Sequence, residues 1–199
     1  TRIAWRPASA TMPYECRGQG ELAFFFDLGI IARGLLSLWR ATGDAEFLEA
    51  AAACARSMDA DFSFASGHHA VLMLPGKTPL EGNGRWSRHP GCYQAKAAMA
   101  WLEVAGAGGG GEFRRCYDEA VQRHLATHTG FLDQEPVPER VMDRLHAYCY
   151  FLEALPNETA AEAYEYFRKL AAMGRVIPAL ANGDLQREIG DRAGQRSGG

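Results

Sequence analysis

Residues 24–39 read FFFDLGIIARGLLSLW, and this stretch decides how the chain folds. At helical spacing it is apolar on almost every side, with Asp27, Arg33 and Ser37 as the interruptions. A helix that is apolar all round is buried all round. The stretch is shorter than the roughly 20 apolar residues that cross a bilayer, and it contains two charged side chains. We therefore predict a buried core helix and no membrane span.

A second helix follows after a very short turn. Thr42-Gly43 ends the first helix, because glycine readily adopts the left-handed conformation that follows a helix C-terminus. Asp44 then caps the stretch AEFLEAAAACARSM, whose apolar residues form a single stripe. An apolar helix paired with an amphipathic one across a short turn is an antiparallel helical hairpin. We predict this hairpin over residues 24–60.

The same unit occurs twice more. The stretches CYQAKAAMAWLEVA and VMDRLHAYCYFLEAL are mostly apolar, and an amphipathic stretch follows each of them. We therefore predict an all-α fold of consecutive hairpins at 24–60, 92–128 and 141–175. They make up one helical domain, residues 24–180, between an irregular arm (1–23) and a polar, glycine-rich tail (181–199).

The loop between the first two hairpins, residues 61–91, is unusually long for a helical domain. Long loops of this kind are either functional or disordered, and its aromatic and apolar content argues against disorder. The run AVLML at 70–74 is either a short strand or a buried extended segment.

Composition excludes some partners. The chain has 199 residues, a formal net charge of −3 and no basic stripe, so nucleic acid is not expected as a partner. Its five cysteines are odd in number and form no CxxC pair, which is typical of free thiols in a reducing cytoplasm. We expect a cytoplasmic protein without a signal peptide. The first residue is not Met, which indicates a fragment or a processed chain.

Three stretches, FDLGIIARGLLSLWRATGDAEFLEAA, YQAKAAMAWLEVA and DRLHAYCYFLEAL, resemble the six-hairpin (α/α)-toroid proteins, the six-hairpin glycosidase-like superfamily. The resemblance covers residues 24 to about 175. It implies a ring of inner and outer helices with a pocket over one end of the inner ones, and a saccharide or another small molecule as substrate. Only three hairpins can be recognised, so we expect a half-toroid or open array that missing hairpins or a partner chain would complete.

The resemblance places candidate site residues at the loop ends of the inner helices. Asp27 and Asp143 are the candidate catalytic carboxylates, since paired acids cleave glycosidic bonds by general acid/base catalysis. The alternative for each is an acid in the first helical turn that the helix dipole stabilises. His146 is either a core histidine or the proton-transfer group of a sugar epimerase.

Other residues at this end are candidates for binding the saccharide. Four of them lie at or near matching points of the repeats: His89, Tyr93, Gln94 and Arg144. The fifth, Trp86, belongs to the polar, partly aromatic loop before the second hairpin. Trp86 either stacks on a sugar face or anchors its loop, and Arg144 either binds substrate or pairs with Asp27 or Asp143.

No cofactor is expected. The motifs GxxxxGK[ST], GxSxG and HExxH do not occur, and GAGGGG lies between helices rather than after a strand. His68, His69, His89 and Cys92 lack the tight spacing of a zinc site, so no metal is expected either. Three functions stay open: a glycoside hydrolase-like enzyme, a sugar epimerase or isomerase that uses histidine, and a non-catalytic scaffold that binds a glycan or protein on its concave face.

Overall fold

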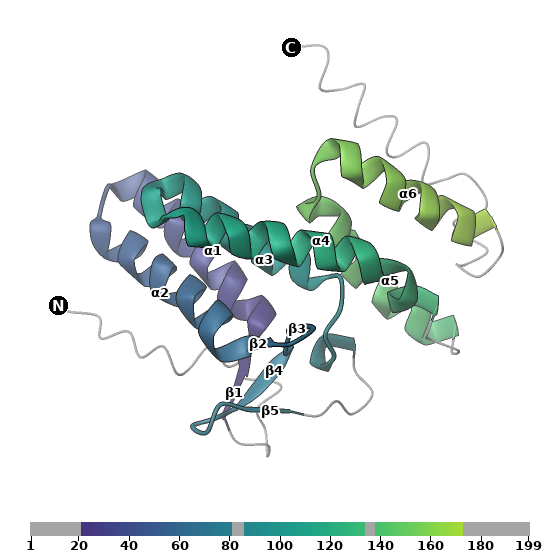
Figure 1. Ribbon diagram of the computed structural model, residues 1–199, viewed down its shortest axis with the longest axis horizontal. Coiled ribbons are helices and arrows are strands. Elements are labelled where there is room, and N and C mark those ends of the chain that lie inside the picture. Colours follow the sequence, from purple (N-terminus) through teal and green to yellow (C-terminus); the bar gives the residue numbers. More distant parts are fainter. Residues whose placement is uncertain (1–20, 81–85, 134–137, 173–199) are drawn as a thin grey trace, which may run out of the picture.

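The computed structural model describes residues 21–80, 86–133 and 138–172, and this part of the chain is mostly helical (Figure 1). It contains six α-helices, in sequence order α1 (Phe25–Thr42), α2 (Ala45–Phe62), α3 (Gln94–Val104), α4 (Gly111–Asp133), α5 (Pro138–Ala154) and α6 (Asn157–Ala172). The prediction of a mainly helical chain is confirmed. The predicted tail (181–199) and all but the end of the predicted arm (1–23) lie outside the described residues.

The turn between α1 and α2 has the predicted capping. Gly43 adopts a left-handed conformation with φ of 72°, and its N–H donates a 2.8 Å hydrogen bond to the carbonyl of Trp39. The Asp44 carboxylate accepts a 3.0 Å hydrogen bond from the backbone N–H of Glu46. These two caps end one helix and begin the next within two residues, so α2 returns antiparallel along α1.

Helix α3 lies at the centre of the fold. It packs against α1 on one side and α5 on another, while α2 and α4 also contact it. It is rich in alanine, and Ala97 touches Gly29 of α1 so closely that a Cβ on Gly29 would lie 2.6 Å from the Ala97 Cα. Trp101 is fully buried and donates a 2.8 Å hydrogen bond to the carbonyl of Ala55 in α2.

Ion pairs near the surface join α1 to α3 and α3 to α5. Arg33 of α1 pairs with Glu103 of α3 at 2.7 Å, and Lys96 of α3 pairs with Glu153 of α5. Small side chains inside and charged pairs outside thus hold α1, α3 and α5 next to one another.

Short antiparallel strands correct the all-α prediction. Strand β1 (Glu21–Phe24) pairs with β4 (Val71–Leu74), and β4 pairs with β5 (Thr78–Pro79). A second small pair joins β2 (Ser63–Phe64) to β3 (Gly67–His68). The run at 70–74 is therefore largely a strand, and the end of the predicted arm is its partner.

Helix α4 extends past the predicted end of the second hairpin at residue 128. Its buried positions explain why, because they continue at alternating spacings of four and three: Tyr117, Val121, His124 and Phe131 are buried and His128 is half-buried. A turn at Ala105–Gly109, in which Gly108 has a φ of 94°, separates α4 from α3.

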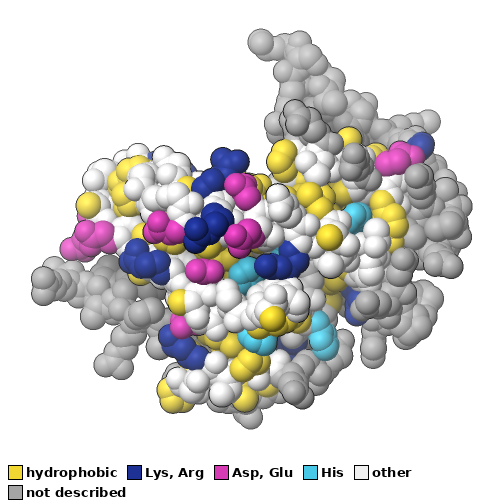
Figure 2. Space-filling model, viewed as in Figure 1, with side chains coloured by type: hydrophobic (Ala, Val, Ile, Leu, Met, Phe, Trp, Pro, Cys, Tyr) yellow, Lys and Arg dark blue, Asp and Glu magenta, His cyan; other side chains and the backbone are white. Residues whose placement is uncertain are grey.

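The surface is mixed in charge. Figure 2 shows basic and acidic side chains interleaved on the face in view. Arg114–Asp118 and Arg115–Glu119 are ion pairs of this kind, one helical turn apart on α4. Among the residues that the structure describes, no helix combines the length and apolar character needed to span a membrane.

Candidate functional site

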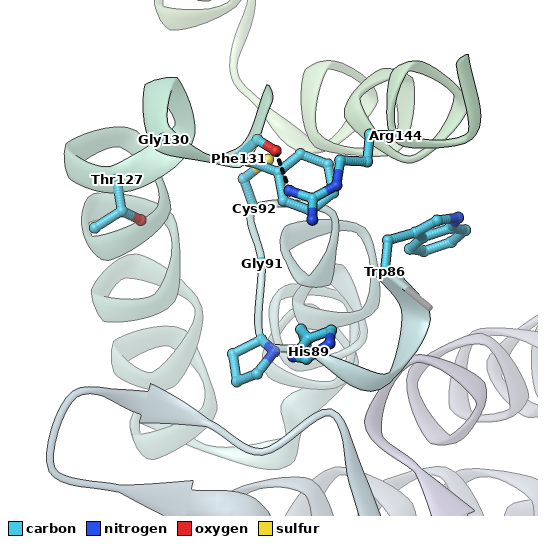
Figure 3. Close-up of a pocket in the computed structure, with 9 residues that line it drawn as sticks. Trp86, His89, Gly91, Cys92, Thr127, Gly130, Phe131 and Arg144 are labelled. Carbon is cyan, nitrogen blue, oxygen red and sulfur yellow. Dashed lines mark hydrogen bonds between the residues drawn. The ribbon is translucent and has the colours of Figure 1, made fainter. Parts of the chain in front are cut away.

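A cavity of about 480 Å³ lies where the loop before α3 meets the end of α4 and the start of α5 (Figure 3). A short 3-10 helix, Trp86–Arg88, belongs to this loop. The lining comes from three separate parts of the chain: Trp86 and residues 89–92 of the loop, Thr127, Gly130 and Phe131 of α4, and Arg144 of α5.

Arg144 is held in a defined position in the cavity wall. Its Nη1 donates a 2.6 Å hydrogen bond to the carbonyl oxygen of Phe131, which Figure 3 marks with a dashed line. Its guanidinium carbon lies 5.3 Å from the centre of the Phe131 ring, a cation–π distance. The side chain is half-buried, and it joins α5 to the end of α4.

Tyr93 packs against two of the residues that line the cavity. It is fully buried, and its hydroxyl donates a 3.0 Å hydrogen bond to the carbonyl of His89. The Trp86 ring meets it edge to face, with 4.9 Å between ring centres, and Phe131 lies against it at 6.0 Å. Burial raises the pKa of Tyr93, and Cys92 and Asp27 add smaller contributions, so the phenol stays neutral.

Close packing in the cavity lining also requires a glycine at position 91. A Cβ on Gly91 would lie 2.7 Å from the Phe131 ring, so a side chain there would displace the ring. The neighbouring Cys92 is buried, and burial raises the pKa of its thiol, which excludes a thiolate nucleophile at neutral pH.

Gln94 is a buried structural residue. Its Oε1 accepts a 3.0 Å hydrogen bond from the backbone N–H of Gly91, and its Nε2 donates to the carbonyls of His68 at 3.2 Å and His69 at 3.4 Å. The side chain thereby attaches the start of α3 to the loop that carries β3. It does not line the cavity.

The two candidate catalytic acids, Asp27 and Asp143, lie on different helices. Asp27 lies half-buried in the first turn of α1, near enough to Tyr93 to affect the pKa of that phenol. It is not among the residues that line the cavity. Asp143 belongs to α5, and its side chain lies outside the described residues.

His146 is exposed on α5 and therefore does not occupy the core. Its Nε2 lies 2.7 Å from the hydroxyl of Tyr150, one helical turn further on. Of the predicted site residues, the structure gathers Trp86, His89 and Arg144 around one cavity, and Tyr93 packs against Trp86. Asp27, Gln94 and His146 do not line the cavity.

The three lining residues that belong to α4 were not predicted from the sequence. Thr127, Gly130 and Phe131 lie in or next to a segment that reads as the linker after the second hairpin. The alternating spacing of buried positions along α4 is the signal that would have extended the helix to include them.

A pair of buried histidines lies outside the cavity. His68 of β3 stacks on Phe25, with 5.0 Å between ring centres, and its ring also lies 5.2 Å from that of Trp101. Burial, aided by the nearby charge of Arg123, lowers the pKa of His68 to about 4. Burial likewise lowers the pKa of His124 on α4 to about 3, with His68 and Arg123 as further causes.

In the described part of the chain, these two imidazoles are not joined by further metal-ligating side chains. His68 Nδ1 and His124 Nε2 are buried and have no hydrogen-bond partner in the described part of the chain. No three His, Cys, Asp or Glu side chains in that part are arranged to hold a metal ion.

Comparison of this chain with protein-family models, with curated proteins and with solved structures found no match. The chemistry of the cavity must therefore be inferred from its lining. It offers aromatic rings, a hydroxyl, an imidazole and a guanidinium, which suit binding of a small polar molecule with an apolar face.

Proposed function

We propose that this chain is a saccharide-binding section of an (α/α) toroid and belongs with carbohydrate-active proteins. The packing of α3 between α1 and α5, with α2 and α4 as further neighbours, supports an inner layer and an outer layer of hairpins. The cavity lies near the N-terminal ends of α3 and α5, the end at which the toroid resemblance expects a pocket.

The lining of the cavity is the observation that carries this proposal. Sugar rings present an apolar face edged by hydroxyl groups, and their sites combine aromatic side chains with a few directed polar groups. Trp86 and Phe131 supply the aromatic surface, while Thr127, His89 and Arg144 supply hydrogen-bonding groups. A volume of about 480 Å³ lies within the usual range for small-molecule sites, roughly 300–1,000 Å³.

Binding is better supported than catalysis. The described lining residues include no carboxylate, and exposed His146 is poorly placed for an epimerase. Glycoside hydrolysis with Asp27 and Asp143 as the acids is our second proposal. The observation in its favour is that Asp27 lies near Tyr93, whose ring contacts Trp86 and Phe131 at the cavity.

Saturation-transfer NMR with a panel of mono- and oligosaccharides tests the proposal. We expect Trp86→Ala to weaken saccharide binding by roughly tenfold, because it removes an aromatic stacking surface. Phe64→Ala is the matched control, since Phe64 is a partly exposed aromatic residue of β2 that does not line the cavity.

Two results would contradict saccharide binding here. One is the absence of binding by any saccharide to a chain whose circular dichroism shows it to be folded. The other is an equal loss of binding in the Trp86 and Phe64 variants. For the second proposal, hydrolysis of an oligosaccharide that Asp27→Asn leaves unchanged would exclude Asp27 as a catalytic acid.

A further inference from the structure

We infer that Tyr166 of α6 is a positioning residue for the cavity, because its hydroxyl holds the end of α4 that forms one of the cavity walls. This inference rests on the proposed saccharide-binding function and adds to it a residue that does not itself line the cavity. It comes from the contacts that α5 and α6 make with the last two turns of α4.

These last two turns of α4 supply one wall of the cavity. Thr127, Gly130 and Phe131 belong to them, and all three line the cavity (Figure 3). Thr129 lies within the same segment, and its backbone carbonyl accepts a 2.9 Å hydrogen bond from the hydroxyl of Tyr166. A displacement at Thr129 therefore moves Gly130, the next residue, and Thr127 in the same helical turn.

The ring of Tyr166 packs against the same segment. It meets the ring of His128 edge to face, with 5.3 Å between ring centres. His128 in turn stacks on Phe151 of α5 at 5.3 Å, and its Nδ1 lies 2.7 Å from the hydroxyl of Tyr148. His128 and Thr129 do not line the cavity. Helices α5 and α6 thus hold this wall through residues that leave the lining itself free.

Tyr166 is the contact that separates support of the wall from the wall itself. Arg144 also holds the end of α4, through the carbonyl of Phe131, but it is part of the lining. Tyr148 is fully buried, so a change there would disturb the core as well. Tyr166 is half-buried and lies outside the lining, so Tyr166→Phe removes its hydrogen bond to Thr129 and leaves every lining side chain in place.

A wall that is fixed before the ligand arrives lowers the cost of binding. Without the hydrogen bond from Tyr166, the end of α4 populates further positions, and the apparent affinity falls with the fraction of chains that have the binding-competent one. The coupling is reciprocal. A ligand that favours the position of α4 seen here must also favour the attachment of α6 to it.

Saccharide titrations by NMR test this inference on the Tyr166→Phe variant. We expect binding to weaken by roughly three- to tenfold, the range that the loss of one hydrogen bond allows. Tyr164→Phe is the matched control, because it makes the same substitution at a more exposed tyrosine of the same helix. It should leave the affinity within about 1.5-fold of that of the unmodified chain.

Hydrogen exchange with and without saccharide separates positioning from a general loss of stability. In the unmodified chain, a saturating saccharide should slow exchange in α6 more than in α2, although neither helix lines the cavity. In the Tyr166→Phe variant this additional protection of α6 should be lost. A merely structural role would speed exchange in α6 equally with and without saccharide, and the protection by the ligand would persist.

The outcomes distinguish this inference from the proposed function. Unchanged saccharide affinity in Tyr166→Phe, or an equal loss in Tyr164→Phe, would overturn the positioning role and leave saccharide binding standing. Persistent protection of α6 by saccharide in the Tyr166→Phe variant would overturn it as well. Binding of no saccharide by the folded, unmodified chain would overturn the proposed function and this inference with it.

Discussion

Gln94 shows how much one buried polar side chain contributes to this fold. It makes three hydrogen bonds to the backbone, one to Gly91 and two to the carbonyls of His68 and His69. Gln94→Met keeps a similar length but leaves these buried groups without their side-chain partner. We expect the free energy of unfolding to fall by about 2–3 kcal/mol, measured by urea denaturation.

Gln122 provides the control for this prediction. It is exposed on α4, so Gln122→Met should change the stability by no more than about 0.5 kcal/mol. A similar small effect at Gln94 would mean that its hydrogen bonds contribute little to the folded state.

Residues 93 and 94 also mark a limit of sequence analysis. Both were expected to face the saccharide because they lie at the loop end of an inner helix. The N-terminal end of α3 is covered on one face by the segment around His68, which is far from Gln94 in the sequence. This segment packs over Gln94 and keeps its side chain out of the cavity. His89 and Arg144 could be placed near one another from the sequence because each lies close to the start of an inner helix, and Trp86 lies in the loop beside His89; all three line one cavity.

At the level of elements, the contact between α1 and α3 depends on one glycine. A Cβ on Gly29 would lie 2.6 Å from the Cα, Cβ and carbonyl oxygen of Ala97, so the helix backbones would have to move apart. We expect Gly29→Ala to reduce the free energy of unfolding by about 2–3 kcal/mol, in line with overpacked cores. Thermal or urea denaturation provides the measurement.

Gly34, also in α1, is the matched control, and there we expect alanine to raise the stability rather than lower it. Gly34 is exposed and has nothing within 4 Å of a Cβ placed on it. Gly34→Ala should therefore stabilise the chain by about 0.5–1 kcal/mol, because alanine favours the helix more than glycine does. Equal effects of the two substitutions would show that α1 and α3 do not pack as described.

The elements differ in how far the sequence could predict them. The hairpin of α1 and α2 was predictable because its signals are local: an apolar period, a left-handed glycine and a capping aspartate. The pairing of β1 with β4 was not predictable, because the two strands lie on either side of the first hairpin in the sequence. Their register joins Glu21 to Leu74 and Phe24 to Val71. Such short strands have no periodicity of their own to reveal the pairing.

At the scale of the whole molecule, the interior around His68 and His124 joins the first two hairpins. His68 lies in the loop after α2 and stacks on Phe25 of α1 and near Trp101 of α3, while His124 belongs to α4. The fold can bury them only as neutral imidazoles, because the charged form loses its hydration and meets Arg123. Asp59 opposes this effect at His68, but only in part.

Acid should therefore unfold the molecule through these histidines. The pKa of His68 is about 4 in the folded chain against a usual 6.5, so the unfolded chain binds more protons between these values. The contribution to stability is complete above pH 6.5 and is lost as the pH falls toward 4, by about 3 kcal/mol for His68. The lower pKa of His124 extends the loss toward pH 3. Urea denaturation at intervals from pH 7 to pH 4 measures it.

Substitution separates this effect from the titration of acidic residues. His68→Gln and His124→Gln should each flatten the fall in unfolding free energy between pH 6.5 and 4, whatever they do to the stability at pH 7. An unchanged slope in both buried variants would mean that carboxylates alone cause the acid sensitivity. A flattened slope would show that the junction of the first two hairpins requires neutral imidazoles.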